Sequence, residues 1–447
     1  MLAGYALPAL ISHMPQLVLS IAVFVIAYVA IASERFPRQA VALLGGVTLV
    51  VINVFDLKEA FSFVDWETMG LLFGMFILIE ILKEAGFFGW LAATVARRLK
   101  YQPTAIFIAF PLMAGLLSGL MDSITVMLFL SALSVRLARL INIDPVPLIV
   151  AEVCAANAGG AATLVGDPPN VILGTVLGFN FTDFVINTGP IALVALLITV
   201  GIFYLANRPM LKAAHASGSA PLFAMGLGHG IENVTMLRVG LAGFGVAIAL
   251  LVSHSLLPKD FPIHIGTATA ALAPALIAVV VGGKHTRESI GKIDIESLLF
   301  FIGLFIMVGA LQKTQVISQL AEGIGRIGLG NPPALLMLLL WGSGLTSGVV
   351  DNIPMALAMA YVLKDLAVMA GAPALSIMTW ALAVGIDIGG NLTPVGASAN
   401  VVAYTFMERN VGKVGWGRWI RMAAVPTLVS MAACSVLILI KYAIGFY

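Results

Sequence analysis

Five acidic residues lie in strongly apolar stretches of the sequence, where ionisable side chains are rare and usually functional. They are Asp122, Glu152, Asp167, Asp351 and Asp387. No Lys or Arg accompanies them within these stretches. Such carboxyl groups must be protonated, accept hydrogen bonds from a helix start, or meet a cation. The sequence therefore predicts a site that handles protons or cations.

Two of these acids interrupt pairs of apolar segments, at Asp122-Ser123 and Asp351-Asn352. The pairs span about 104–140 and 333–367 and are predicted to form helical hairpins with the Asp at the turn. Asp, Ser and Asn commonly cap helix starts. A helix start aimed at the bilayer centre also attracts anions or polar ligands, and the turn carbonyls can hold a cation. We expect both capping and binding at these tips.

A third feature is the segment from Asn157 to Asn170, in which Gly159-Gly160 precedes Asp167-Pro168-Pro169. The glycines loosen the backbone and each proline removes a donor, so a continuous helix is not expected. The segment from Asp387 to Asn400 also has a glycine pair and a proline. Unwound backbone at membrane depth is tolerated only where protein buries it or where it lines a wet cavity. A packing kink is the alternative reading.

These motifs belong to an internal repeat, because Asp122 aligns with Asp351 when the second half is laid over the first. After one inserted residue, Asn157–Val171 aligns with Asp387–Val401. Asn157 therefore matches Asp387, so one half offers a neutral amide where the other offers an acid. Asp387 is the first choice for a proton-carrying or cation-coordinating group. Asp167 is expected to cap a helix, and Glu152 is a secondary candidate for proton relay.

Composition identifies the surroundings in which these groups work. The chain has 447 residues, of which 60% are hydrophobic and only 10% charged, with a net charge of +2. Soluble domains carry about 25% charged residues, so the chain is predicted to lie in a membrane. This excludes a cytoplasmic enzyme, a nucleic-acid binder and a disordered scaffold. The two cysteines are far apart, and neither a disulfide framework, a metal site nor a cofactor is expected.

Apolar runs long enough to cross a membrane predict an all-α polytopic protein with about ten spans besides the two hairpins. The spans lie near 16–32, 39–55, 67–83, 146–178, 186–206, 237–254, 264–282, 294–311, 372–408 and 420–446. The first is expected to be a retained anchor. Whether each hairpin turns back at mid-membrane or crosses fully stays open.

Basic residues favour cytoplasmic loops and so predict orientation. With both termini outside, eighteen of the 24 Lys and Arg residues fall on the inside and six on the outside. Five spans separate equivalent points of the repeat, so the halves are predicted to be inverted, an architecture of secondary transporters. The predicted divisions are 1–207 for the first repeat, 208–235 for a cytoplasmic linker and 236–447 for the second repeat.

The motifs GGAATLVGDPPNVIL, GGNLTPVGASANVVA and SGVVDNIP, with the run DWETMGLLFGMFILIEILKEAGFFGWLA, resemble the arsenical-permease and NhaD branch of the ion transporter superfamily, which includes relatives of the melanosomal P protein. The resemblance implies re-entrant hairpins, broken helices around one central site, often a homodimer, and an elevator-like movement. Relatives commonly have Asn where this chain has Ser123. The Ser-Asn-Thr hairpin motif of sodium-coupled dicarboxylate transporters is absent from both tips, which argues against sodium-driven succinate or citrate uptake.

The candidate site combines the residues that the resemblance carries over with the two glycine pairs of the breaks. They are Asp122, Ser123, Thr125, Asn157, Gly159, Gly160, Thr163, Asn170, Asp351, Asn352, Asp387, Gly389, Gly390, Thr393 and Asn400. Proton coupling is assigned to Asp387, Asp351, Asp122 and Glu152.

The function hypothesis is a proton-coupled secondary transporter of the inner membrane that exports a small inorganic solute, with arsenite or antimonite as the best guess. It depends on several carboxyl groups without an Arg or Lys clamp, which suit a neutral hydroxide-like solute, or a cation exchanged against protons, better than a bare dianion. A sodium/proton antiporter and an organic-anion permease are the alternatives. A membrane-embedded enzyme would need a nucleophile with its base, and a passive channel gives no reason for duplicated breaks. A cytoplasmic ATPase or metallochaperone partner cannot be read from the sequence.

Overall fold

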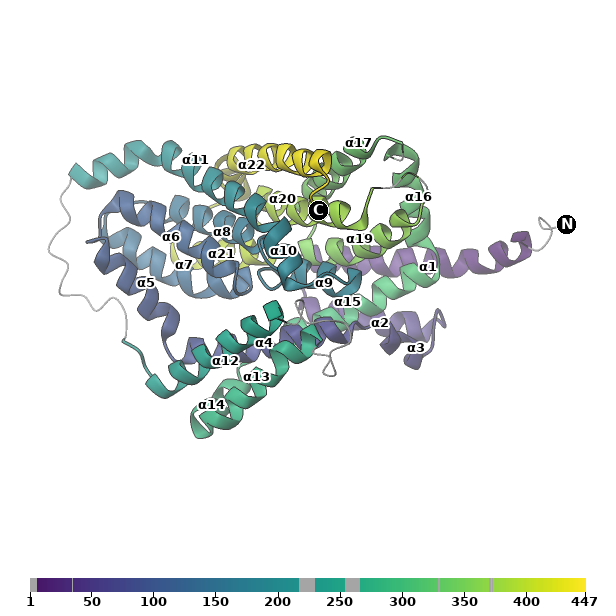
Figure 1. Ribbon diagram of the computed structural model, residues 1–447, viewed down its shortest axis with the longest axis horizontal. Coiled ribbons are helices and arrows are strands. Elements are labelled where there is room, and N and C mark those ends of the chain that lie inside the picture. Colours follow the sequence, from purple (N-terminus) through teal and green to yellow (C-terminus); the bar gives the residue numbers. More distant parts are fainter. Residues whose placement is uncertain are drawn as a thin grey trace.

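The structure is a computed structural model that describes residues 6–33, 35–216, 230–253, 266–328, 330–369, 371 and 373–447. Within these ranges the chain is helical and contains no strand, which confirms the predicted all-α class. Long helices run side by side in two packing groups (Figure 1). Each group takes helices from both halves of the sequence.

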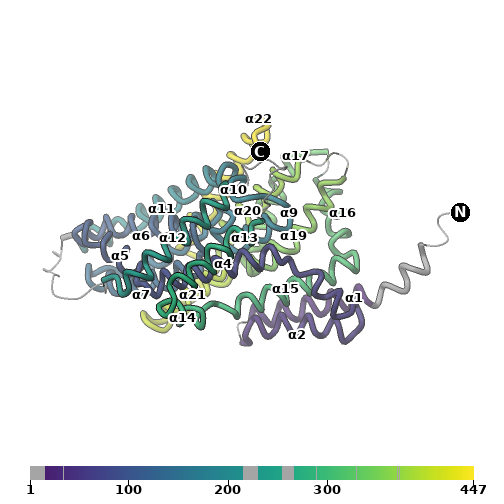
Figure 2. Tube along the Cα trace, turned by 60° about the horizontal axis from the view of Figure 1, so that its bottom comes forward, coloured from purple at the N-terminus to yellow at the C-terminus, as the bar shows by residue number. Residues whose placement is uncertain are grey.

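The first group, called here the outer group, holds helices that pack pairwise, α2 on α15 and α4 on α13. Its members are α1 (Ala6–Ala32), α2 (Arg38–Val51), α4 (Trp66–Glu84), α12 (Val234–Ser253), α13 (Thr267–Gly282) and α15 (Ile295–Lys313). Glycines at matched repeat positions make both close pairings: a Cβ at Gly74 would overlap the α13 backbone, and one at Gly303 the α2 backbone. Figure 2 shows α2 and α15 adjacent along one edge of the molecule.

The second group, called here the inner group, contains the hairpins and the broken helices. Its first-half members are α6 (Pro103–Ser118), α7 (Ser123–Leu140), α8 (Pro145–Gly160), α9 (Pro168–Leu177) and α11 (Gly189–Ala216). Its second-half members are α17 (Pro332–Met337), the π-helical turn Leu338–Gly342, α18 (Ser343–Ser347), α19 (Asn352–Ala367), α20 (Leu375–Gly389), the 3₁₀ turn Gly390–Leu392, α21 (Ser398–Asn410) and α22 (Trp416–Ile444). Helices α8 and α20 are buried along almost their whole length.

Shorter helices connect these elements. They are α3 (Leu57–Ser62), α5 (Phe87–Arg98), α10 (Phe181–Asn187), α14 (Lys284–Ile290) and α16 (Val316–Gly328). Helices α9 and α10 are bent against each other by 115°.

Local sequence explains where the helices begin, and the same signals recur in both halves. Asp65 accepts a hydrogen bond from the amide of Thr68 at 2.8 Å, and Asp294 accepts one from Ser297 at 2.9 Å. Prolines occupy the first turns of α6 and α17, where a missing N–H costs nothing. Both predicted hairpins are present, with α6–α7 and α17–α19 turning at their Asp residues.

The glycine pairs act differently from the prediction. Helix α8 continues through Gly160 and α20 through Gly389, so the glycines do not loosen the helices. They permit close packing instead: a Cβ at Gly159 would overlap the Gly115 carbonyl of α6, and one at Gly389 would overlap Gly344 of α18. The chain leaves the α-helix after Gly160 in the first half and at Gly390, where the 3₁₀ turn begins, in the second half.

The described residues include six helices long and apolar enough to cross a membrane. Six shorter apolar helices include the first arms of both hairpins and the first part of the first broken helix. Several apolar spans are thus present, while their predicted number and the inversion of the halves stay predictions.

The predicted linker, 208–235, falls partly on residues 217–229, which lie outside the described ranges. Helix α11 continues past Arg208 to Ala216. The division into 1–207 and 236–447 remains a prediction about the repeat, since helices of both halves share each packing group.

Candidate functional site

The two hairpin tips form the first part of the site. Asp122 caps α7 by accepting a hydrogen bond from the Thr125 amide at 2.8 Å, and Asp351 caps α19 through the Ile353 amide at 3.3 Å. The second carboxyl oxygen of Asp122 is buried and has no partner within the described ranges. The predicted capping is confirmed, and each tip keeps an acid at the start of its second helix.

Asp167 joins the two tips, which corrects the expectation that it caps α9. Its side chain makes no capping hydrogen bond. One carboxyl oxygen accepts from the Ser123 hydroxyl at 2.6 Å and the other from the Asn352 amide at 3.0 Å. One buried carboxylate therefore holds both hairpins. The two prolines after Asp167 are typical of a helix start and favoured the capping interpretation. The actual partners of Asp167 lie far away in the sequence, so no local pattern indicates them.

Asn170 and Asn400 fasten the unwound segments in the same way. The Asn170 amide donates to the carbonyls of Gly160 at 3.0 Å and Thr163 at 3.1 Å. The Asn400 amide donates to the carbonyls of Gly390 at 2.9 Å and Thr393 at 2.8 Å. These duplicated bonds are the structural counterpart of the sequence repeat, and they leave the side-chain oxygen of each Asn facing the interior.

Asn157 meets one of these oxygens. Its amide donates to Asn400 Oδ1 and to Asn391 Oδ1, both at 2.8 Å. Asn391 was not among the predicted site residues because its repeat partner is an alanine, Ala161, and the alignment gives it no weight. Its amide contacts the Cys154 carbonyl at 3.4 Å, and its own carbonyl accepts from the Trp419 indole at 3.0 Å.

Asp387 occupies the position equivalent to Asn157 but has no such partners. It is fully buried, and neither carboxyl oxygen accepts a hydrogen bond in the described part of the chain. Its polar neighbours are Asp167 and Asn170, and the two carboxyl groups interact electrostatically. Asn170 Oδ1 is likewise buried without a partner. The first half therefore has an amide bonded to two side-chain oxygens, whereas the second half has a carboxyl group beside Asp167 and Asn170.

The site thus holds an excess of hydrogen-bond acceptors. The unpaired buried atoms of its described residues are all oxygens, on Asp122, Asn157, Asn170, Asn352 and Asp387. The amide orientations are fixed by the network, because each NH₂ group already faces carbonyl or carboxylate oxygens. Buried acceptors without donors are costly. The site therefore favours a ligand that brings donors or positive charge.

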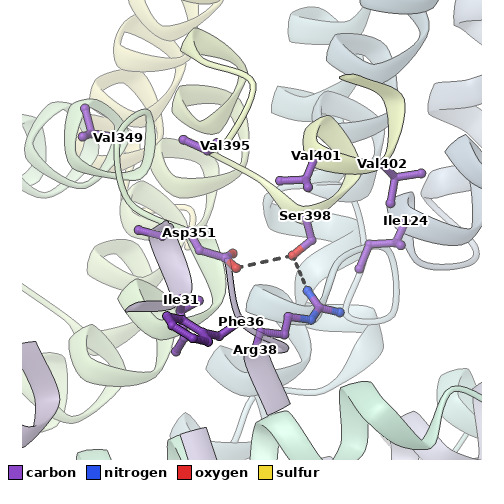
Figure 3. Close-up of a pocket in the computed structure, with 11 residues that line it drawn as sticks. Ile31, Phe36, Arg38, Ile124, Val349, Asp351, Val395, Ser398, Val401 and Val402 are labelled. Atoms are coloured by element: carbon purple, nitrogen blue, oxygen red, sulfur yellow. Dashed lines mark hydrogen bonds between the residues drawn. The ribbon is translucent and has the colours of Figure 1, made fainter. Parts of the chain in front are cut away.

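Arg38 was missed in the sequence, where it counted as an ordinary cytoplasmic-side charge. It starts α2, and its guanidinium donates to the hydroxyls of Ser398 and Ser297, both at 2.9 Å. Ser398 lies 3.5 Å from Asp351, so a polar chain runs from Arg38 to the second hairpin tip (Figure 3). The premise that no Arg or Lys stands at the site is therefore wrong. Its sequence position beside Phe36 and Pro37 gives no sign of this contact.

Two cavities lie at the tips. The first, about 330 Å³, is lined by Arg38, Asp351 and Ser398 (Figure 3). The second, about 480 Å³, is lined by Arg38, Asp122 and Thr125 together with residues of the outer group. Arg38 and Ile124 line both. Each hairpin acid thus faces its own cavity, and Arg38 stands beside both.

The remaining predicted residues have local roles. Glu152 accepts from Ser134 at 2.5 Å and keeps one buried oxygen unpaired within the described part, away from the hairpin tips. The Thr163 hydroxyl donates to the Gly119 carbonyl at 2.7 Å and holds the first unwound segment to its hairpin. The Thr393 hydroxyl accepts from the Val395 amide at 3.3 Å.

Comparison with known proteins places the chain among membrane transporters. Residues 28–385 match the family model CitMHS, described as citrate transporter. An uncharacterized transporter of Mycobacterium tuberculosis is 35% identical over 433 residues, covering 95% of this chain and 98% of that protein. The human P protein is 27% identical over 492 residues, covering 91% of this chain and 58% of that protein.

Two solved structures share the fold. The YdaH transporter of Alcanivorax borkumensis has a TM-score of 0.59 at 19% identity and covers 87% of both chains. MtrF of Neisseria gonorrhoeae, described as belonging to a class of antimetabolite efflux pumps, has a TM-score of 0.57 at 14% identity, covering 88% of this chain and 83% of that one.

Proposed function

The chain belongs to the CitMHS family, whose model is described as citrate transporter, and on this premise we propose that it is a proton-coupled secondary active transporter. Asp167 and Asp387 carry the proton. Both are buried, they interact with each other, and in the described structure no basic side chain contacts either. Two buried like charges are expensive unless a proton or a cation neutralises one of them.

The proposed solute is arsenite or antimonite, which the protein exports. The observation that carries this choice is the excess of unpaired acceptor oxygens at the site. At neutral pH these solutes are uncharged hydroxides, and their O–H groups supply donors that the site lacks. A proton on Asp387 would itself supply a donor among these acceptor oxygens, beside Asp167 and Asn170. Proton and solute then compete for the same acceptors, which is the basis of an exchange.

Everted membrane vesicles from cells that express the protein test this function. A pH gradient with an acidic vesicle interior should drive accumulation of arsenite inside the vesicles. A protonophore should abolish this accumulation, and vesicles without the protein should show none. If the gradient drives no accumulation of arsenite or antimonite, the solute is wrong.

A sodium/proton antiporter is the second candidate, since Na⁺ takes oxygen ligands and the same unpaired oxygens could coordinate it. It predicts sodium-dependent dissipation of the pH gradient without arsenite movement. A carboxylate permease is favoured by the family description and by Arg38, the cation that lines both cavities. It predicts citrate accumulation in right-side-out vesicles with an acidic exterior.

We also propose that the protein lies in the inner membrane with both termini outside, on the strength of the eighteen to six distribution of basic residues. The two packing groups support an elevator-like movement of the inner group against the outer group. Reporter fusions after Tyr447 test the orientation, and a cytoplasmic C-terminus would reject it. We further propose a homodimer, which the family resemblance implies, and cross-linking in the membrane tests it.

A further inference from the structure

Arg38 stands between the outer and inner groups in a position that no other described basic residue shares. Its guanidinium donates to Ser297 on α15 and to Ser398 on α21, so one side chain contacts both groups. It lines both cavities, whereas the other basic residues that line a cavity at the hairpin tips, Lys83 and Lys292, line the second one alone.

The charge of Arg38 is also not cancelled by a direct partner. Lys83 pairs with Glu80 at 3.0 Å, and Lys292 pairs with Glu84 at 2.6 Å. Arg38 makes no ion pair with any acidic side chain of the described ranges, and its two hydroxyl partners are neutral. Asp351 interacts with Arg38 electrostatically but does not form a direct ion pair with it, so the positive charge of Arg38 still acts on both cavities.

The chemistry of the site makes such a charge significant. Four acidic side chains line the second cavity and attract cations: Glu80, Asp122, Asp294 and Glu296. At the hairpin tips, buried side-chain oxygens also have no hydrogen-bond partner in the described residues. Oxygen atoms of this kind can hold Na⁺ as readily as a hydroxylated neutral solute can donate to them. Acceptor geometry alone does not discriminate between the two.

We propose that Arg38 is a specificity-determining residue that rejects monovalent metal cations and leaves the acceptor-rich site to an uncharged, hydroxyl-bearing solute. This inference rests on the proposed function. A unit charge about 10 Å from an ion, at an effective dielectric constant of about 20, changes the ion's affinity by roughly tenfold. A neutral solute experiences no comparable repulsion, so the guanidinium separates the two classes by charge.

The test is a gain of sodium binding. Purified wild-type protein and the variant Arg38→Gln are melted thermally in NaCl and in choline chloride at equal ionic strength. A ligand that binds the folded state raises apparent stability. We expect no sodium-specific shift for the wild type and a sodium-specific rise for Arg38→Gln, with an apparent sodium affinity about tenfold higher. A gain cannot result from misfolding.

Three variants separate charge from other roles. Arg38→Lys keeps the charge and should behave as wild type. Ser398→Ala removes a partner of Arg38 but keeps the charge, and should also stay insensitive to sodium. Lys83→Gln removes a positive charge from the wall of the second cavity alone and is the matched control, with no expected sodium-specific rise.

The inference is overturned if Arg38→Gln gains no sodium-specific stabilisation, if Ser398→Ala gains as much as Arg38→Gln, or if the wild type already responds to sodium. Loss of stabilisation by citrate or phosphate in Arg38→Gln, without a sodium response, would overturn it in favour of an anion-binding role. Failure of the proposed function is a separate result, because it would appear as absent proton-driven arsenite uptake by the wild type.

Discussion

Replacing Asp387 by Asn is the most informative change, because the protein contains its own reference for the result. Asn157 occupies the equivalent position in the first half, where its amide donates to two side-chain oxygens at 2.8 Å. Asn170 is the repeat partner of Asn400, so we expect an amide at 387 to donate to Asn170 Oδ1, which now has no partner in the described structure. It would also remove the repulsion between Asp387 and Asp167.

The expected effect on stability is therefore a gain relative to the wild type with Asp387 ionised, because a protonated Asp387 already brings a donor to the site. An unsatisfied buried acceptor costs about 1–3 kcal/mol, so supplying a donor should stabilise the folded state by about that amount. With an unfolding entropy of about 2 cal/mol/K per residue, a chain of this length should gain about 1–3 °C in melting temperature. Transport should respond in the opposite direction, because an amide cannot carry a proton: proton-driven uptake should be abolished.

The assay combines thermal melting of Asp387→Asn in detergent with uptake by everted vesicles. Asn157→Asp is the matched control, since it places a carboxyl group against the oxygens of Asn391 and Asn400 and loses two hydrogen bonds. It should destabilise the fold by about 2–5 kcal/mol. Retained proton-driven uptake in Asp387→Asn, or destabilisation comparable to that of Asn157→Asp, would refute the reasoning.

Three further changes have defined outcomes. Ser123→Ala removes the 2.6 Å bond to the central carboxylate and should cost about 1–3 kcal/mol in thermal or denaturant melts, whereas Ser131→Ala, whose buried hydroxyl has no described partner, should be nearly neutral. Gly159→Ala places a methyl group against a backbone carbonyl and should lower the free energy of unfolding by at least about 1–3 kcal/mol and reduce the folded yield. Gly201→Ala, which has open space around it, should leave stability unchanged or raise it slightly. Equal effects of the two variants would reject the packing role of Gly159. Glu152→Gln keeps its neighbouring serine bond and should leave solute binding unchanged while slowing proton-driven uptake several-fold if the residue relays protons; unchanged uptake removes it from the path.

Local signals in the sequence predicted the framework of the fold. Helix starts at Asp122 and Asp351 follow from capping chemistry that acts over two or three residues, and the repeat supplies this signal twice. The hairpins were predictable for the same reason. The role of the glycine pairs was not, because a close approach of α6 to α8 depends on how the helices pack and leaves no trace in local conformation.

The centre of the site depends on contacts between residues that are distant in the sequence, and only some of its residues could be predicted. Asp387 could be identified because its repeat partner, Asn157, is a neutral amide. The sequence predicted a helix cap at Asp167, and this was wrong because the partners of Asp167, Ser123 and Asn352, come from separate hairpins. Arg38 could not be found from the sequence, because whether a basic residue at a helix start faces solvent or a cavity is decided by helices packed against it from elsewhere in the chain.

The carboxyl pair also bears on how such a protein could have arisen by duplication. Asp167 has Ala397 as its repeat partner, with nearly the same backbone conformation, and Asp387 has Asn157. The first half contributes one acid and the second half the other, so two copies of either half would lack the mixed pair. The chemistry at the centre thus depends on both halves of the chain, and it requires that the two halves differ at these two positions.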